Sequence, residues 1–337
     1  MNSEILGVLL MYLLVVLLAI PLGRYIGKIF NYEPTWLDRL FNPIDNLFFK
    51  LSGVNPKTEM TWKQHAIALL TINFIWFLIC MLILTNMSNL PLNPDNNPSM
   101  SGDLAFNTAV SFVTNTNLQH YSGESGLSYL GQLILMLWQF ISAGTGIAIC
   151  AVVFAAMQSR TVATLGNFYS FFVRSCTRIL FPIAVIVAIT LVFNGVPMTF
   201  AGKDTITTLQ GDTVMVSRGP VAGFVAIKQI GTNGGGFFGP NSAHPFENPN
   251  YFTNVVETVS ISLIPIAMIF ALGYVLKRKK LANVIFGVMT AGFLLLCIPS
   301  IMNEMQGNKS IENMGISSEE HTSELQSPPV ISYTVFC

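Results

Sequence analysis

The sequence predicts an all-α polytopic membrane protein in which re-entrant loops connect membrane-spanning helices. First, 52% of the 337 residues are hydrophobic and only 10% are charged, whereas soluble domains carry about a quarter charged residues. Second, six long stretches lack charged residues altogether. Third, two short apolar segments each precede a polar turn. The net charge is zero, which argues against a nucleic-acid partner. The five cysteines form no CxxC pair, so neither disulfides nor a zinc site is expected.

The charge-free stretches mark six predicted spans, each apolar and long enough to cross a hydrocarbon core of about 30 Å as a helix. They cover residues 5–23, 66–85, 127–157, 179–196, 258–276 and 281–303. The first stretch follows Glu4 and precedes Arg24 and Lys28, which is the wrong flank for a signal peptide. We therefore interpret it as an uncleaved span.

Basic residues predict the orientation of the spans. Lysine and arginine gather in segments 24–63, 158–178 and 277–280, whereas segment 86–126 contains three acids and no base. The positive-inside rule places the basic segments in the cytoplasm. The N-terminus and segment 86–126 are then predicted to lie outside the cell.

Segment 86–126 contains a predicted half-helix. Residues 104–113 read LAFNTAVSFV, preceded by Ser101 and Asp103 as capping candidates. Ten helical residues reach about 15 Å, which is half of the membrane. A half-helix that enters from outside and returns as TNTNLQ is tolerated only where it lines a wet cavity enclosed by protein.

The same arrangement returns between the fourth and fifth spans. Pro220 suits the first turn of a second half-helix, PVAGFVAIKQI, which is followed by GTNGGG at 231–236. Aligning Thr114 and Asn115 with Thr232 and Asn233 superposes two units of span, half-helix, polar turn and span. The internal repeat is weak in identity and clear in layout.

Both turns offer ligands for a monovalent cation. The C-terminus of a helix carries about half a negative charge, and each half-helix directs it at its turn. Backbone carbonyls, hydroxyls and amide oxygens can replace water around an alkali ion, and neither turn contains a carboxylate of the kind that divalent sites usually recruit. The predicted selectivity filter consists of Val113, Thr114, Asn115, Thr116, Asn117, Gln119, Gly231, Thr232, Asn233, Gly234 and Gly235.

Each of these residue patterns also has an alternative interpretation. One Thr/Asn-rich turn between apolar helices is usually an exposed loop, but two on the same predicted face favour a filter. GTNGGG lacks the Lys-Ser/Thr ending of a phosphate loop and is predicted to lie outside the cell. Lys228 is expected to reach towards the outer surface rather than to lie near the ion path. His244 and Glu247 are expected to anchor a loop by hydrogen bonds rather than to bind a metal.

Four motifs carry a family resemblance: PLNP, AVSFVTNTNLQHYSGE, GTNGGGFF and NSAHPFENP, in this order. They resemble the potassium-binding subunit of the Kdp-type potassium-transporting ATPase, over the chain up to about residue 315. The resemblance implies a bacterial inner-membrane protein of the superfamily of potassium transporters, with four span–loop–span units around one filter. It also implies that K⁺ is the transported ion and that the residues of the two turns match the family's first two filter loops.

The resemblance further implies three partners: a P-type ATPase subunit that hydrolyses ATP, a single-span accessory subunit and a small stabilising peptide. In this family the potassium-binding subunit passes the ion through the membrane to the ATPase subunit. The chain has no DKTGT-type phosphorylation motif, so it is not expected to cleave ATP itself.

The chain departs from the family pattern near its end. Two further filter loops are missing, and residues 317–337 contain SEEHTSELQS, which looks like a translated sequencing adapter. The predicted organisation is a first span and cytoplasmic loop at 1–63, one unit at 64–157, a second at 158–276, the start of a third at 277–316 and a non-native tail at 317–337. A chain with two loops, on its own, is not expected to transport potassium.

Two rival functions belong to other classes. In a self-sufficient channel or symporter, a homodimer would supply four loops, although its sixth span would then be unpaired. A membrane-embedded enzyme would need a convergent nucleophile, base or metal cluster, and the sequence offers none.

Overall fold

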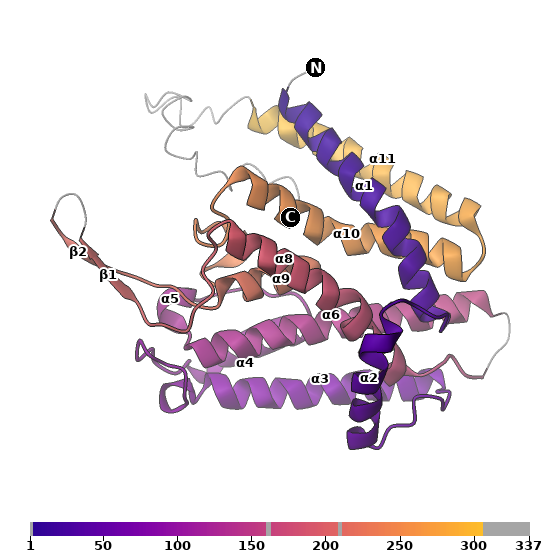
Figure 1. The fold of residues 1–337 in the computed structure, drawn as a ribbon, viewed down its shortest axis with the longest axis horizontal. Helices are drawn as coiled ribbons and strands as arrows, with labels where there is room; N and C mark the ends of the chain where they lie inside the picture. The colour runs from indigo at the N-terminus through magenta and orange to yellow at the C-terminus, as the bar shows by residue number, and fades with distance from the viewer. Residues whose placement is uncertain (1–2, 160–162, 208–210, 306–337) are drawn as a thin grey trace.

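The computed structural model describes residues 3–159, 163–207 and 211–305 (Figure 1). The predicted tail at 317–337 lies outside the described residues. Within them the protein is an all-α bundle with one small β-hairpin. The all-α polytopic fold class predicted from the sequence is therefore confirmed.

Among the described residues, six helical segments are long and apolar enough to cross a membrane. They are α1 (Ser3–Phe30), α3 (Trp62–Leu84), α6 (Tyr129–Gln158), α7 and α8 (Phe168–Ser175 and Phe181–Phe193, joined by the π-helical turn η2, Cys176–Leu180), α10 (Tyr251–Val275) and α11 (Lys279–Glu304). Each contains or overlaps one predicted span.

The fourth span begins at residue 168 rather than at the predicted 179. The criterion of a charge-free stretch placed Arg174 and Arg178 in a loop, but both lie inside the helical segment. Arg178 is tolerated there because Asp38 and Asp45 pair with its guanidinium. A paired charge costs far less to bury than an isolated one, so the prediction of this boundary was wrong.

Polar N-caps define where several spans begin. Thr61 forms a capping box with Gln64 ahead of α3, and the Ser128 hydroxyl accepts from the Gly131 amide at the start of α6. Asn250 caps α10 in the same way. These side chains satisfy backbone amides that lack a partner within the helix, which fixes the first turn of each span.

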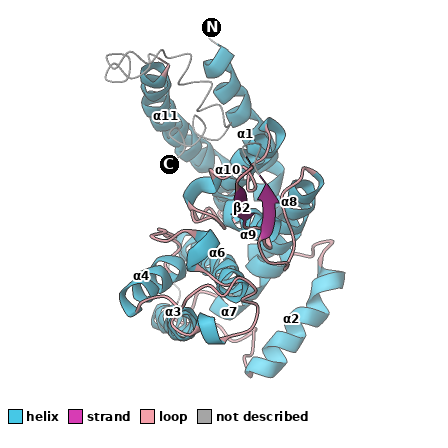
Figure 2. Cartoon of the chain, turned by 90° about the vertical axis from the view of Figure 1, so that its left-hand side faces the viewer, coloured by secondary structure: helices cyan, strands magenta, loops and turns pink. Residues whose placement is uncertain are grey.

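The two predicted half-helices are present as α4 (Gly102–Val113) and α9 (Val221–Ile230). Ser101 is the N-cap of α4, although its side chain makes no capping bond, and Pro220 is the N-cap of α9 rather than part of its first turn. Helix α4 packs on α3 and α6, while α9 packs on α6, α8 and α10 (Figure 2). Most side chains of α9 are buried, so it belongs to the interior of the bundle.

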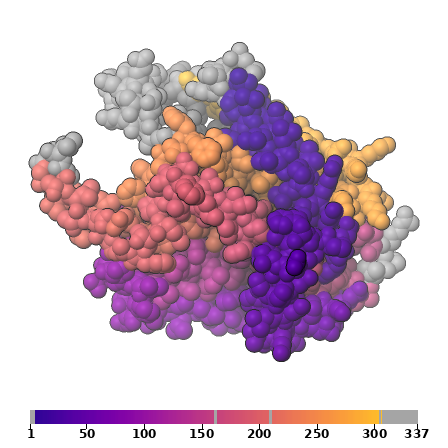
Figure 3. Space-filling model, viewed as in Figure 1, coloured from indigo at the N-terminus to yellow at the C-terminus, as the bar shows by residue number. Residues whose placement is uncertain are grey.

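The remaining elements lie at the ends and the surface of the bundle. They are α2 (Asp38–Ser52), α5 (Gly123–Gly126), the 3₁₀ turns η1 (Met87–Asn89) and η3 (Pro240–Ser242), and the antiparallel strands β1 (Asp204–Thr207) and β2 (Thr213–Val216), which pair in the register Asp204 with Val216. The hairpin projects from the body of the molecule, and α2 lies on the surface that faces the viewer in Figure 3.

Helix α1 packs closely along α10 because two glycines face that helix. A Cβ at Gly23 would lie 2.5 Å from the Ala267 carbonyl oxygen, and one at Gly27 would lie 2.6 Å from the ring of Tyr274. Small residues let apolar helices approach each other in this way inside a membrane. The first span is thereby held against the second unit rather than the first.

Candidate functional site

The C-terminal ends of the two half-helices meet at one cavity of about 410 Å³. The ends of both half-helices line it: Val113, Thr114 and Asn115 after α4, and Ile230, Gly231 and Thr232 after α9. Three spans complete the wall with Asn73 of α3, Ser142 and Thr145 of α6, and Pro265 and Met268 of α10. The structure therefore brings residues of both predicted filter turns to the same space.

The two turns follow the same backbone path. In each, three successive amides return to carbonyls of the preceding helix at the same spacing. In the first turn, Thr114, Asn115 and Thr116 donate to the carbonyls of Val110, Phe112 and Ser111; in the second, Gly231, Thr232 and Asn233 donate to those of Ile227, Gln229 and Lys228. The same three bonds also end α1, at Asn31 to Glu33, and α10, at Leu276 to Arg278, so they are a common way to end a helix and the repeat stays a prediction.

The register of that repeat differs by one residue from the sequence alignment. The hydrogen bonds place Gly231 opposite Thr114 and Thr232 opposite Asn115. Counted from the helix ends, the two turns therefore correspond one residue away from the alignment of Thr-Asn with Thr-Asn.

Alternate residues of both turns have positive φ. The angles are 62° at Asn115 and 53° at Asn117 in the first turn, and 54° at Thr232 and 106° at Gly234 in the second. Residues of alternating handedness turn their amides to one side of the chain and their carbonyls to the other. Asparagine and glycine adopt this conformation readily, whereas a β-branched threonine does so only under constraint.

Asn115 joins both turns to α6. Its Oδ1 accepts hydrogen bonds from the Ser142 hydroxyl at 2.8 Å and from Nδ2 of Asn233, while its own Nδ2 donates to the Gly231 carbonyl at 3.4 Å. Gln139 of α6 adds a bond from Nε2 to the Gly235 carbonyl at 3.4 Å. The side chain of Asn115 thus acts as a structural link between the two predicted filter loops.

Gln119 forms a second link between the turns. Its Nε2 donates to the Gly236 carbonyl at 3.0 Å, and its Oε1 accepts from the Gly236 amide at 2.9 Å. Both ends of the amide are therefore occupied by the backbone of the second turn. In this arrangement Gln119 holds the second turn in place.

Two buried amide side chains retain unused polar atoms. Neither Nδ2 nor Oδ1 of Asn117 has a hydrogen-bond partner among the described residues, and the same holds for Oδ1 of Asn233. Buried polar atoms are normally paired with protein or water. Both side chains are buried and neither lines the cavity, so these atoms are enclosed by the protein around the turns.

A buried polar group behind the second turn was not predicted. Lys228 is only 1% exposed and donates to the Ser242 hydroxyl, while its neighbour Gln229 donates to the buried carboxylate of Glu257. The expectation that Lys228 reaches the outer surface is wrong, because α9 is enclosed by spans. Glu257 was missed because it lies one residue before a charge-free stretch, and such charges were assigned to loops.

The loop after the second turn is anchored as expected. Glu247 is fully buried and accepts from the Phe238 amide at 2.7 Å, while Nδ1 of His244 accepts from the Phe246 amide at 3.1 Å. Burial lowers the pKa of His244, although the carboxylate of Glu124, 3.4 Å from its Nε2, acts in the opposite direction. No group of three or more His, Cys, Asp or Glu side chains suited to a metal ion occurs among the described residues.

Comparisons with known proteins point to one family. A family model described as potassium-transporting ATPase A subunit matches residues 9–326. Proteins named potassium-transporting ATPase potassium-binding subunit are similar to this chain: that of Flavobacterium johnsoniae is 62% identical over 317 residues and that of Flavobacterium psychrophilum is 63% identical over 317. The protein of that name from Bacteroides thetaiotaomicron is 51% identical over 325 residues. These matches cover 94%, 94% and 96% of the chain but only 55%, 55% and 57% of the relatives, so the chain spans about half their length.

Proposed function

The chain belongs to the family of potassium-transporting ATPase A subunits, and from this premise we propose that it binds extracellular potassium and carries the ion into the membrane. In this proposal it is the channel-like, potassium-selective subunit of an ATP-driven uptake complex. It does not cleave ATP; a P-type ATPase subunit in another chain does so. The ion passes from the two turns into the cavity below them and on to that subunit.

The observation that carries the proposal is the pair of turns with equivalent backbones at the wall of one cavity. Each follows the C-terminus of a half-helix, where the helix dipole favours a cation. Neither turn contains a carboxylate, so the available ligands are carbonyl, hydroxyl and amide oxygens. Such neutral oxygens suit a dehydrated monovalent ion.

The proposed filter keeps the residues identified from the sequence. They are Val113, Thr114, Asn115, Thr116, Asn117 and Gln119 in the first turn and Gly231, Thr232, Asn233, Gly234 and Gly235 in the second. The hydrogen bonds support a division of roles. Asn115 and Gln119 brace the turns through their side chains, and the backbone carbonyls face the ion.

The proposed setting is the bacterial inner membrane, with the N-terminus and both polar turns on the outer side. The clustering of lysine and arginine in segments 24–63 and 277–280, against their absence from 86–126, supports this orientation. The proposed partners are the ATPase subunit, a single-span accessory subunit and a small stabilising peptide.

The test of the function uses the complete uptake complex, with this sequence as part of its potassium-binding subunit. Gly234→Asp puts a carboxylate and a Cβ into a turn of carbonyls, at a position with φ of 106°. We expect a lower potassium affinity and a smaller preference for potassium over sodium in ATP-dependent transport. The matched control is Gly211→Asp, because Gly211 also has positive φ (93°) but a Cβ there meets nothing within 4 Å.

If Gly234→Asp keeps the affinity and selectivity of the native complex, the second turn is not a filter. Potassium flux without ATP or partner subunits would favour the self-sufficient homodimeric channel instead.

The orientation is tested by thiol labelling in a variant without native cysteines. A cysteine at Ser122 should react with an impermeant reagent added outside the cell, whereas one at Ser159 should react only after the membrane is opened. The reverse pattern would overturn the proposed external approach of the ion.

A further inference from the structure

Helix α2 has three distinct faces. At 100° per residue, positions three, four and seven apart fall on one side of a helix. The face with Asp38, Phe41, Asp45 and Phe49 is turned to the protein, and Leu40, Ile44, Leu47 and Leu51 form an exposed apolar face. The third face carries Arg39, Asn46 and Lys50, all exposed. A helix inside a soluble bundle would have two faces, so the exposed apolar one needs an explanation.

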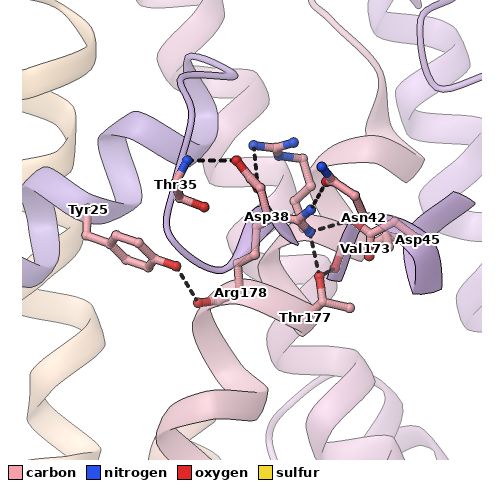
Figure 4. Close-up of polar contacts among 9 residues, drawn as sticks. Tyr25, Thr35, Asp38, Asn42, Asp45, Val173, Thr177 and Arg178 are labelled. Atoms are coloured by element: carbon pink, nitrogen blue, oxygen red, sulfur yellow. Dashed lines mark hydrogen bonds and ion pairs between the residues drawn. The ribbon is translucent and has the colours of Figure 1, made fainter. Parts of the chain in front are cut away.

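The face turned to the protein is fixed by one buried arginine (Figure 4). Arg178, 1% exposed, donates from Nε to Asp38 at 2.8 Å, from Nη1 to Asp45 and from Nη2 to Asn42 at 2.6 Å. Tyr25 of α1 donates to the Arg178 carbonyl at 3.3 Å. Three side chains of α2 are thus held by a single planar guanidinium, and α2 cannot rotate about its axis without breaking these bonds.

The exposed apolar face therefore has a set direction. Its leucines Leu40 and Leu51 are 61% and 77% exposed, and Trp36, just before the helix, is 78% exposed. Figure 1 shows α2 running across the direction of α3 and α6, at the end of the bundle where α1 ends and α3 begins. Helix α2 therefore runs across these spans rather than along them.

The polar face is basic. Arg39 and Lys50 lie on it with Asn46 between them. Lys57 and the exposed Glu59 follow in the segment before α3, and Lys63 lies in the first turn of α3. The two acids of α2 point the other way and are paired with Arg178. The outward polar side of the helix thus presents positive charge alone, which complements an anionic surface.

We propose that α2 lies in the membrane–water interface and binds the headgroups of anionic phospholipids through Arg39 and Lys50. The apolar face enters the acyl region and the basic face meets the phosphates, as in other interfacial amphipathic helices. Trp36 lies at headgroup depth, where indole rings are favoured. The occupant is a lipid surface, because it matches an apolar face and a basic face on the same helix at once.

The depth of each face in the membrane is tested with a fluorescent label on a single introduced cysteine. The complete complex, without its native cysteines, is reconstituted in phosphatidylcholine vesicles with or without phosphatidylglycerol. A label on Leu47→Cys should be quenched by nitroxides on acyl chains and protected from iodide. A label on Asn46→Cys, the adjacent residue, should show the opposite pattern. If neither quencher reaches Leu47→Cys, another protein segment covers this face and the proposal fails.

The charge preference is tested with headgroup-labelled lipids at the Asn46→Cys position. Quenching by phosphatidylglycerol should exceed that by phosphatidylcholine at equal content. Arg39→Gln with Lys50→Gln should lower the excess by about fivefold per basic residue at low salt. Lys279→Gln with Lys280→Gln is the matched control, because it removes the same charge from the exposed start of α11 and should leave the excess unchanged. Equal quenching by both lipids in the native complex would overturn the proposal.

Discussion

The two turns at the cavity share a backbone and differ in side chains. The first reads Thr-Asn-Thr-Asn-Leu-Gln and the second Gly-Thr-Asn-Gly-Gly-Gly, yet both repeat the same returning hydrogen bonds and the same positions of positive φ. The repeated feature is therefore the path of the carbonyls. Side chains are free to differ wherever they do not disturb that path.

The difference in side chains has a spatial reason. At equivalent positions the first turn has Gln119 and the second has Gly236, and the amide of Gln119 bonds to the backbone of Gly236. A Cβ on Gly235 would lie 3.2 Å from Asn117 and from Gln139. The first turn thus supplies bracing side chains, and the second must be bare to receive them.

The largest expected effect comes from filling the second turn. A Cβ at Gly236 would lie 2.1 Å from the Gly239 carbonyl oxygen and 2.7 Å from the Glu247 carboxylate. We expect Gly236→Ala to destabilise the protein by about 3 kcal/mol or more. Gln119→Ala, at the equivalent position, should cost about 1–3 kcal/mol by leaving the Gly236 amide and carbonyl unpaired.

Both losses of stability are measured by heating the detergent-solubilised protein and monitoring the folded fraction by size-exclusion chromatography. Gly239→Ala is the matched control, since a Cβ there meets nothing within 4 Å. Equal losses for Gly236→Ala and Gly239→Ala would show that the second turn is not tightly enclosed.

The next equivalent pair is Asn117 and Gly234. Exchanging these residues should lower the free energy of unfolding by unequal amounts. Gly234→Asn forces a side chain into φ of 106°, outside the usual left-handed region, and should cost about 1–2 kcal/mol. Asn117→Gly removes an amide without a hydrogen-bond partner among the described residues and relieves φ of 53°, so the change should stay below about 1 kcal/mol. Unfolding temperatures of both variants decide this. A larger loss for Asn117→Gly would mean that its amide holds the turn together.

The bond between the turns should appear as an energetic coupling. Asn233 donates to Asn115, so removing either side chain removes the same interaction. In a double-mutant cycle of Asn115→Ala and Asn233→Ala, we expect a coupling of about 1 kcal/mol. Asn241→Ala in place of Asn233→Ala is the control and should be additive. Additivity of the first pair would mean that the turns are held independently.

How much the sequence could predict follows from what each feature depends on. The half-helices were predictable because a short apolar run before a polar turn is a local pattern. The register of the two turns was not, because Thr-Asn occurs in both at positions that the backbone does not equate. Identity of side chains and position after the helix end give two different alignments of the turns.

The buried charges were missed for a different reason. Arg178 pairs with Asp38 and Asp45, which are 140 and 133 residues away in sequence. Nothing local shows that this charge is compensated, so it was assigned to a loop. Lys228 was misplaced likewise, because its partner Ser242 lies beyond the glycine turn. Long-range pairing of charges inside a membrane protein leaves no periodic signal.

The smallest expected effect is a dependence of stability on pH. It should involve the loop after the second turn and not the loop after the first. His244 beyond the second turn stacks on Phe238 and accepts the Phe246 amide at Nδ1, which requires that nitrogen to be unprotonated. Burial lowers the pKa of His244 below its ordinary value near 6.5, so the unfolded chain takes up the proton first. The stabilising contribution is complete above about pH 6.5 and declines as the pH falls below it.

We therefore expect the unfolding temperature to fall between about pH 7 and pH 5, and His244→Asn to flatten that decline. His120 is an exposed histidine beyond the first turn, and His120→Asn should leave the change of unfolding temperature with pH as it is in the native protein. If the native protein and both variants lose stability in parallel as the pH falls, protonation of His244 does not govern the stability of this loop.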